Sequence, residues 1–218
     1  MKITKFGHCC LLIDTSATLS AGENGVRILT DPGTYSTQQN EVKNIDVVLI
    51  THEHQDHFHI DSLKAVLKNN PQAKIITNKS VGALLEKENI AFSIVEDGQS
   101  SDANGVLIKG HGSKHALMHS SIPVIQNTGY FIANRLFYPG DALTNPGRQI
   151  EILALPIAGP WLKLSEALDY ALEMKPKTCF LVHEGEKTAS WMERIPKQVL
   201  EPKGIKFMVL EIDKEYEF

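Results

Sequence analysis

The stretch 52–57, with the sequence HEHQDH, holds three histidines and an aspartate. Imidazole nitrogens and carboxylate oxygens are ligands that divalent zinc takes in proteins. Because His52, His54, Asp56 and His57 share one short loop, their side chains can face a common point. A solvated surface loop is the plain alternative, but histidine is an uncommon residue and a chance cluster around an acid explains the stretch poorly. The pattern therefore predicts a metal site.

Further residues of ligand type follow predicted strands later in the chain. His115, Asp141 and His183 each come after such a strand. In layered α/β folds the strand ends gather along one edge, where sites usually form. Taken singly, each residue also fits a structural role, as a half-buried histidine, a capping aspartate or a solvated loop residue. His111, His115 and His119 are spaced four apart, so spacing alone does not choose among these three histidines.

The order of these residues resembles that of the metallo-β-lactamase-fold hydrolases. Stretch 52–57 matches their His-x-His-x-Asp-His signature, and a histidine, an aspartate after Pro-Gly and a final histidine follow in the same order. Within the superfamily, residues 7–8, 30–32 and 138–141 are similar to the branch that includes the L-ascorbate-phosphate lactonase-like proteins. This superfamily hosts many chemistries, so the resemblance predicts fold and metal site far better than substrate.

The resemblance implies an α/β (α+β) fold, a four-layer αββα sandwich with two mixed sheets face to face and helices outside. It also implies a binuclear site for two divalent metal ions. Zn²⁺ fits the nitrogen-rich ligand set best, with Mn²⁺ or Fe²⁺ as alternatives. His115 is preferred as the third-motif ligand because it directly precedes Ala116 and an apolar step, as the family's third histidine does. The implied ligands are His52, His54 and His115 for the first ion, Asp56, His57 and His183 for the second, and Asp141 as the bridge.

Such a centre implies a metal-bridging hydroxide that attacks a carbonyl carbon or a phosphorus. Asp56 is the predicted catalytic side chain, which orients the nucleophile or takes its proton. Asp31 is expected to accept the free N–H of a ligand histidine, or else to bond nearby backbone in its turn. His8 is expected at the site edge, as a partner of the ligands or as a packed structural histidine. Trp161 and His119 are predicted to line a substrate pocket, although an aromatic ring covering the core is an equal alternative for Trp161.

Short β-prone segments and helical spacings predict the elements that position these residues. Gly, Pro, Ser and Asn separate the segments. Strands are predicted at 2–6, 9–14, 26–30, 45–50, 74–77, 92–95, 106–109, 129–133, 136–138, 152–155, 178–182 and 205–212. Helices are predicted at 60–69, 80–88, 165–175 and 189–195, and 96–105 is predicted to be a loop. No repeat or linker interrupts the chain, so residues 1–218 are expected to form a single hydrolase domain.

Composition narrows the classes of function. The net charge is −4 and no basic run occurs, which argues against a nucleic-acid partner. Three cysteines, two of them adjacent, do not form a disulfide framework. The start lacks a signal-peptide pattern, and no apolar run approaches the ~20 residues that span a bilayer. We therefore expect a cytoplasmic protein without a membrane partner.

The leading hypothesis is a metal-dependent hydrolase of a small-molecule ester, lactone or phosphodiester. A nuclease-like phosphodiesterase and a non-catalytic metal-binding or sensing module are the alternatives. A purely structural zinc domain is the weakest explanation, because structural sites close with four ligands and prefer cysteine. Related folds often pair, so a homo-oligomer stays open, but nothing in the sequence identifies an interface.

Overall fold

Apolar strands form two sheets in the computed structural model, which describes residues 1–16, 25–186 and 188–218. The first sheet contains Lys2–Gly7 (β1), Cys10–Asp14 (β2), Arg27–Thr30 (β3), Val47–Leu49 (β4), Lys74–Thr77 (β5), Ser93–Ile94 (β6) and Glu215–Glu217 (β14). The second contains Ser100–Ala103 (β7), Val106–His111 (β8), Gly129–Ile132 (β9), Leu136–Tyr138 (β10), Ile152–Pro156 (β11), Thr178–Val182 (β12) and Lys206–Met208 (β13).

Both sheets are mixed and repeat one plan. The strand orders are β14-β1-β2-β3-β4-β5-β6 and β13-β12-β11-β10-β9-β8-β7. Pairing is antiparallel from β14 to β3 and from β7 to β10, and parallel from β3 to β6 and from β10 to β13. Because neighbouring parallel strands end at the same edge, the segments after β3 and β4 emerge together, as do those after β10, β11 and β12.

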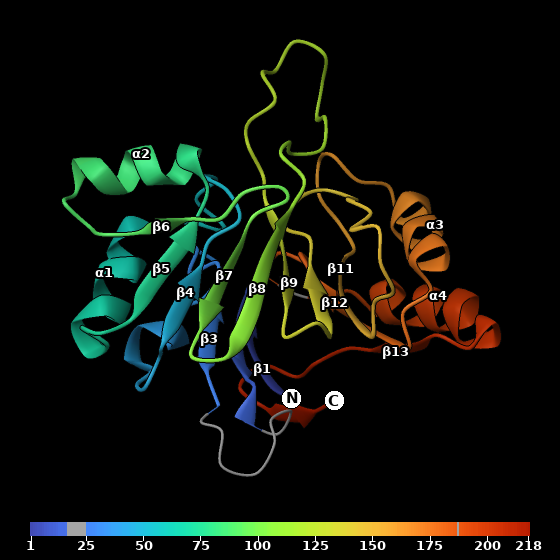
Figure 1. Cartoon of the computed structure of the whole chain (residues 1–218). Coiled ribbons are helices and arrows are strands. Elements are labelled where there is room, and N and C mark those ends of the chain that lie inside the picture. Colours follow the sequence, from blue (N-terminus) through green and yellow to red (C-terminus); the bar gives the residue numbers. More distant parts are fainter. Residues whose placement is uncertain (17–24, 187) are drawn as a thin grey trace.

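Helices cover the outer faces of the two sheets (Figure 1). Ile60–Asn69 (α1) and Lys79–Lys87 (α2) pack on the first sheet, and Leu164–Met174 (α3) and Ser190–Leu200 (α4) on the second. One apolar cluster fills the space between the sheets, and one lies beneath each helix pair. The described residues also contain the short 3₁₀ turns Gln38–Glu41 (η2) and Glu201–Lys203 (η3). The four layers are those of the predicted αββα sandwich.

Helix boundaries follow local side-chain chemistry. Asn78 caps α2, since its side chain accepts the backbone N–H of Val81 at 3.2 Å. Lys163 precedes α3, where the Glu166 carboxylate accepts its backbone N–H at 2.9 Å. Helix α3 ends at Lys175, which takes the left-handed conformation with φ 47°. These contacts fix where α2 and α3 begin and where α3 ends.

Three predictions about elements were wrong. The predicted loop 96–105 contains strand β7, whose SSDA sequence lacks an apolar pattern because it is a largely exposed edge strand. The Asn104-Gly105 pair, with φ of 52° and 88°, makes the hairpin turn that pairs β7 with β8. The predicted strand 205–212 is shorter, because the chain leaves β13 after Met208 and turns at Asp213 (φ 61°) into β14. Helix α4 continues past Pro196 to Leu200.

Within the described ranges, no helix combines the length and the apolar character needed to cross a membrane.

Candidate metal centre

The candidate ligands lie on loops that leave the ends of strands in both sheets. Loop 50–59 follows β4 and carries the HEHQDH stretch, while His115, Asp141 and His183 follow β8, β10 and β12. Of the predicted ligands, His54 and Asp56 are half-buried and the others are buried. The sheets thus bring residues that are more than a hundred positions apart into one centre.

The first group of facing ligand atoms belongs to His52, His54, His115 and Asp141. These atoms, one per residue, all lie within 4.8 Å of one another. His52 Nε2 is 3.2 Å from His54 Nδ1, and His115 Nε2 is 3.3 Å from Asp141 Oδ2. A divalent ion between them would meet three imidazole nitrogens and one carboxylate oxygen, which is a zinc-like ligand set.

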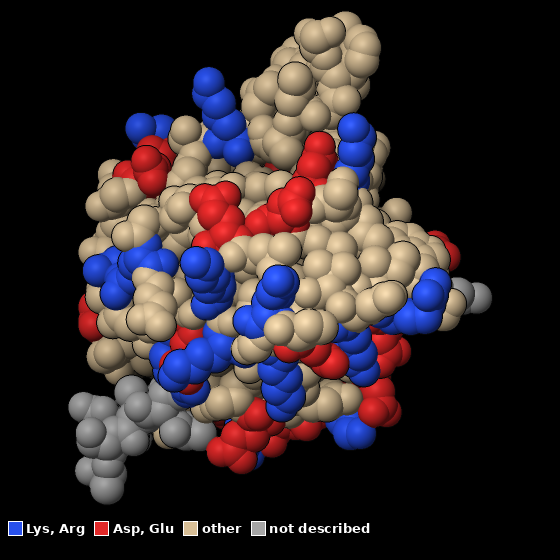
Figure 2. Space-filling model, turned by 90° about the vertical axis from the view of Figure 1, so that its right-hand side faces the viewer, with Lys and Arg blue, Asp and Glu red and all other residues tan. Residues whose placement is uncertain are grey.

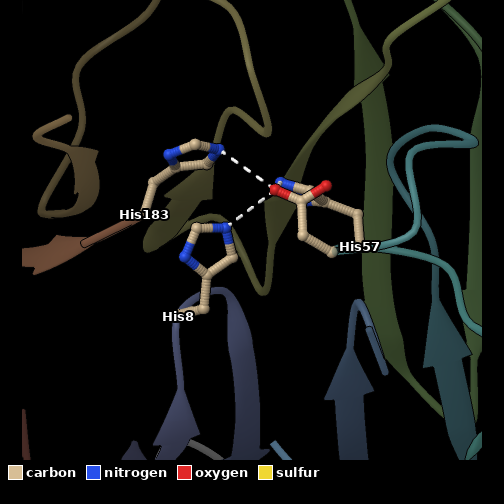
Figure 3. A group of neighbouring side chains, drawn as sticks. His8, His57 and His183 are labelled. Atoms are coloured by element: carbon tan, nitrogen blue, oxygen red, sulfur yellow. Dashed lines mark hydrogen bonds and ion pairs between the residues drawn. The ribbon is translucent and has the colours of Figure 1, made fainter. Parts of the chain in front are cut away.

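The second group contains Asp56, His57 and His183, with His8 as an additional member. Asp56 Oδ2 lies 3.7 Å from the Nε2 atoms of both His57 and His183, and 3.1 Å from His8 Nε2. Figure 3 shows His8 and His183 approaching one carboxylate beside His57. His8 comes from the turn between β1 and β2, and His183 from the end of β12.

Asp141 lies between the two groups. Its Oδ2 is 3.8 Å from His52 Nε2 and 2.8 Å from His183 Nε2, and its Oδ1 is 3.1 Å from His57 Nε2. Oδ2 thus faces one histidine of each group, and Oδ1 faces another histidine of the second group. A ligand that bridges two ions needs this position.

Hydrogen bonds on the outer ring nitrogens leave the inner nitrogens free. His115 Nδ1 and His183 Nδ1 donate to the backbone carbonyls of Ala116 and Ala158, each at 2.6 Å. A carbonyl only accepts, so both rings carry hydrogen on Nδ1 and a lone pair on Nε2. The buried atoms His57 Nε2, His115 Nε2, His183 Nε2 and Asp141 Oδ1 have no hydrogen-bond partner. Unpaired buried polar atoms converging on one region fit metal ions.

Asp31 orients the second group from behind. Its Oδ2 is 2.7 Å from His57 Nδ1 and also accepts the hydroxyls of Thr51 and Tyr138, each at 2.7 Å. Its Oδ1 accepts the Thr51 backbone N–H at 2.8 Å. The Thr51 hydroxyl, whose hydrogen goes to Asp31, accepts from His52 Nδ1 at 2.9 Å. One carboxylate therefore fixes the ring of His57 directly and that of His52 through Thr51.

Three residues of this centre have an unusual backbone conformation. His8, Asp31 and His183 have φ values of 48°, 37° and 61°, in the left-handed region that most L-residues avoid. Such conformations persist only where the surrounding structure holds them, and they gather at functional sites. Here the hydrogen bonds of Asp31 and the contacts between His8 and the 183–185 turn supply that support.

The charges of the centre favour a bound cation. Burial favours the neutral ring of His57, yet the Asp141 and Asp31 carboxylates outweigh it and raise the pKa of His57 well above its usual value. Burial likewise opposes charge on Asp141, but His57 and His183 hold the pKa of this carboxyl well below its usual range. Burial also lowers the pKa of His52, so its ring is neutral. Asp141 and His52 are therefore already in their ligating forms, an ionised carboxylate and a neutral imidazole, whereas His57 releases a proton when it binds an ion.

The other histidines considered for the third motif lie elsewhere. His111 ends β8 and packs edge-on against Phe131 and Phe137. His119 is exposed on segment 112–127, where its Nδ1 bonds the Ser121 hydroxyl at 2.8 Å. Of the three spaced histidines, the structure brings His115 alone into the described ligand groups.

Trp161 is a wall of the centre. Its indole N–H donates to Asp141 Oδ2 at 2.9 Å, and its ring meets those of His115 and His183 edge-on. It is 8% exposed. The ring therefore supports the predicted bridging carboxylate, a contact that its sequence position did not indicate.

Sequence reasoning did not single out Cys9. Its thiol forms a third buried group with His57 and Asp141. Burial raises the pKa of the Cys9 thiol to about 11, so the thiol is protonated at neutral pH. The signal available was its place directly after His8, in the turn before β2.

A cavity of about 240 Å³ opens beside the second group. Tyr35 forms part of its wall and contacts His8, with ring centroids 4.7 Å apart and the rings tilted by 41°. Among the described residues that line the cavity there is no lysine or arginine. They are His8, Tyr35, Asp56, Ala158, Gly159, Pro160, His183, Glu184 and Gly185.

Comparison with known proteins places this chain in a family. The family described as "Beta-lactamase superfamily domain" matches residues 2–183. The protein Rv0786c of Mycobacterium tuberculosis is 35% identical over 189 residues, which cover 84% of each chain. A UPF0173 protein of Pyrococcus abyssi is 30% identical over 85% of this chain and 84% of its own. A UPF0173 metal-dependent hydrolase of Nanoarchaeum equitans is 25% identical over 99% of both chains.

Solved structures share the fold. Igni18, described as a novel metallo hydrolase from Ignicoccus hospitalis, superposes with a TM-score of 0.76 at 22% identity, covering 100% of this chain and 98% of its own. The metallo-β-lactamase fold protein YhfI from Bacillus subtilis gives 0.68 at 13% identity, covering 100% and 99%.

Proposed function

The chain belongs to the β-lactamase superfamily and, within it, to the UPF0173 family, and from this premise we propose that it hydrolyses a small, uncharged ester or lactone at a centre of two divalent metal ions. Its relatives include a named metal-dependent hydrolase, and its fold is the metallo-β-lactamase fold, so the reaction class is metal-dependent hydrolysis. The observation that carries the proposal is the pair of facing ligand groups with Asp141 between them.

The proposed ligand set follows the geometry of the two groups. When bound, the two ions would polarise a substrate oxygen and lower the pKa of a water molecule. Zn²⁺ is proposed because the set is rich in imidazole nitrogen, and Mn²⁺ or Fe²⁺ would suit the carboxylates. His52, His54 and His115 would hold the first ion, Asp56, His57 and His183 the second, and Asp141 both.

Asp56 is the proposed catalytic carboxylate. Its side chain is 25% exposed and lines the 240 Å³ cavity, so it reaches substrate and water where the buried Asp141 does not. Burial opposes its ionisation, but hydrogen bonding to His8 and the nearby His57 hold the pKa of Asp56 well below its usual range. An ionised Asp56 can accept a hydrogen bond from the attacking water and orient it toward the substrate carbon.

The cavity favours an uncharged substrate. A phosphate-bearing lactone of the ascorbate-phosphate type would need cationic partners, because bound phosphate is normally held by arginine or lysine. The described wall of the cavity supplies none and includes the carboxylate of Asp56. The small volume also suits a metabolite better than a polymer, which weighs against a nuclease-like phosphodiesterase.

A projecting apolar segment beside the centre supports the same conclusion. Segment 112–127 rises above the strand ends in Figure 1, and Figure 2 shows its surface free of charged side chains beyond its base. Leu117, Ile122 and Val124 are 59%, 44% and 45% exposed on it. No charged residue occurs between Lys114 and Arg135. An uncharged substrate can approach this surface without losing hydration of a charged group.

A panel of neutral and anionic substrates tests the proposal. Metal-free protein is reloaded with Zn²⁺ or Mn²⁺ and assayed on p-nitrophenyl esters of increasing acyl length, on γ-lactones and on bis(p-nitrophenyl) phosphate. We expect esters or lactones to be hydrolysed faster than the phosphodiester, with activity lost in Asp56→Ala and kept in His111→Ala, a histidine outside the ligand groups. A preference for the phosphodiester would favour the alternative diesterase. Full metal loading without turnover of any substrate would favour a binding or sensing module.

A further inference from the structure

His8 makes more directed contacts with the second ligand group than a packed structural histidine would need. It is 3% exposed at the turn between β1 and β2. Its Nε2 lies 3.1 Å from Asp56 Oδ2, and its Nδ1 accepts the backbone N–H of Gly185 at 3.0 Å. Its backbone carbonyl accepts the N–H of His183 at 3.3 Å. Three polar atoms of one residue therefore contact the loop that carries Asp56 and the turn that carries His183.

These contacts determine which nitrogen of His8 carries the hydrogen. A backbone N–H can only donate, so Nδ1 of His8 must offer a lone pair to Gly185. A ring that keeps this lone pair on Nδ1 is not an imidazolium, so it is neutral. The single hydrogen of the neutral ring is then on Nε2, which donates it to the Asp56 carboxylate.

The same tautomer argues against His8 as a metal ligand. A ligating Nε2 must present a lone pair to the ion. With Nδ1 already accepting from Gly185, that would leave both ring nitrogens without hydrogen, an anionic ring in a buried site. The predicted ligands His115 and His183 show the opposite arrangement, since their Nδ1 atoms donate to carbonyls.

A second contact joins the same two segments. Lys5 of β1 is fully buried, with its ammonium 2.5 Å from Glu184 and donating to the Leu181 carbonyl at 2.9 Å. Strand β1 belongs to the first sheet, whereas Leu181 lies in β12 of the second sheet and Glu184 directly follows His183. Lys5 and His8, both near the start of the chain, thus contact residues before and after His183.

We propose that His8 is a positioning residue that orients Asp56 through its Nε2–H and holds the His183 turn through its Nδ1 and its carbonyl. The proposal rests on the two-ion centre proposed above. Because the two contacts come from opposite sides of one ring, His8 sets the distance between two ligands that belong to different sheets. An orienting partner of this kind typically contributes 10–100-fold to metal affinity.

Two substitutions separate the contacts. In His8→Asn the amide oxygen can replace Nδ1 and accept from Gly185, and asparagine tolerates the positive φ, but no group reaches Asp56. In His8→Gln the longer amide can donate to Asp56 in place of Nε2. We expect His8→Asn to lower the affinity for the more weakly bound of the two Zn²⁺ ions about 10–100-fold and to leave the affinity for the other ion unchanged. His8→Gln should recover most of the lost affinity.

The measurements are chelator competition with Zn²⁺ on metal-free full-length protein, thermal melting of the metal-free variants, and nitrogen-15 NMR of the His8 ring. A Zn²⁺ affinity in His8→Asn equal to that of the wild type would overturn the proposal. A loss of Zn²⁺ affinity as large as that in His57→Ala would also overturn it, because His8 would then be a ligand. Equal weakening of both ions together with a lowered melting temperature would show a merely structural role. If wild-type protein takes up fewer than two ions, the two-ion centre fails, and the NMR still decides on His8: hydrogen on Nδ1 overturns the proposal.

Discussion

Asp31 Oδ2 lies 2.7 Å from Nδ1 of His57, and both residues are completely buried. They are twenty-six positions apart and meet because β3 and β4 are parallel neighbours. The same oxygen accepts the hydroxyls of Thr51 and Tyr138. Asp31 thus links the HEHQDH loop to both sheets, and its carboxylate sets the ring orientation of a proposed ligand.

Replacing this carboxylate by its amide should weaken metal binding. Asparagine has the same shape and tolerates the φ of 37°, but its NH₂ group would meet three donors where Oδ2 now accepts. We expect Asp31→Asn to lower Zn²⁺ affinity about 10–100-fold in chelator competition. Unchanged affinity would show that His57 does not depend on Asp31 for its orientation.

Metal content should depend on the ligands contributed by the second sheet. Wild-type protein purified without chelator is expected to carry about two ions per chain by mass spectrometry. Asp141→Ala and His183→Ala should each carry less, because His183 belongs to the second group and Asp141 faces it. His111→Ala and His119→Ala are matched histidine controls outside the groups and should keep the wild-type content. Loading indifferent to Asp141 and His183 would contradict the proposed ligand set.

The Lys5–Glu184 pair should dominate the stability of the turn that carries His183. Lys5→Met leaves the buried Glu184 carboxylate without its cation, which typically costs about 3–5 kcal/mol of unfolding free energy. Denaturant unfolding of the metal-free protein measures this loss. The double variant Lys5→Met/Glu184→Gln should recover part of it, because no charge is then left unpaired. Lys64→Met, which breaks an exposed pair with Glu88, should have little effect.

Metal removal should lower the melting temperature. Ions that bind the folded chain stabilise it by about 2.7 kcal/mol at a hundred times Kd, or roughly 5–11 °C for a chain of this size. Scanning calorimetry with and without chelator measures the shift. His183→Ala should show a smaller difference between the two conditions, since one of its proposed ions binds weakly. A wild-type melting temperature that does not change when chelator is added would argue against any bound ion.

Local sequence was sufficient for the HEHQDH cluster and for most elements. Three histidines and an aspartate on one loop predict a metal site without reference to the rest of the chain. Residues 60–69 show helical spacing, and 178–182 form a continuous apolar run, so period and composition predict α1 and β12. Strand β7 was not predicted because exposed edge strands need no apolar pattern, although the Asn104-Gly105 pair is typical of a hairpin turn.

What the sequence by itself determined is the type of chemistry: ligand residues at strand ends, in an order that resembles one superfamily. Only the tertiary structure decided which of the spaced histidines faces His52, because His111 and His115 differ by the path of a loop after β8. It alone paired His8 with Asp56 and Trp161 with Asp141. These contacts join segments far apart in the chain, and their geometry depends on how two sheets pack, which no local pattern of residues encodes.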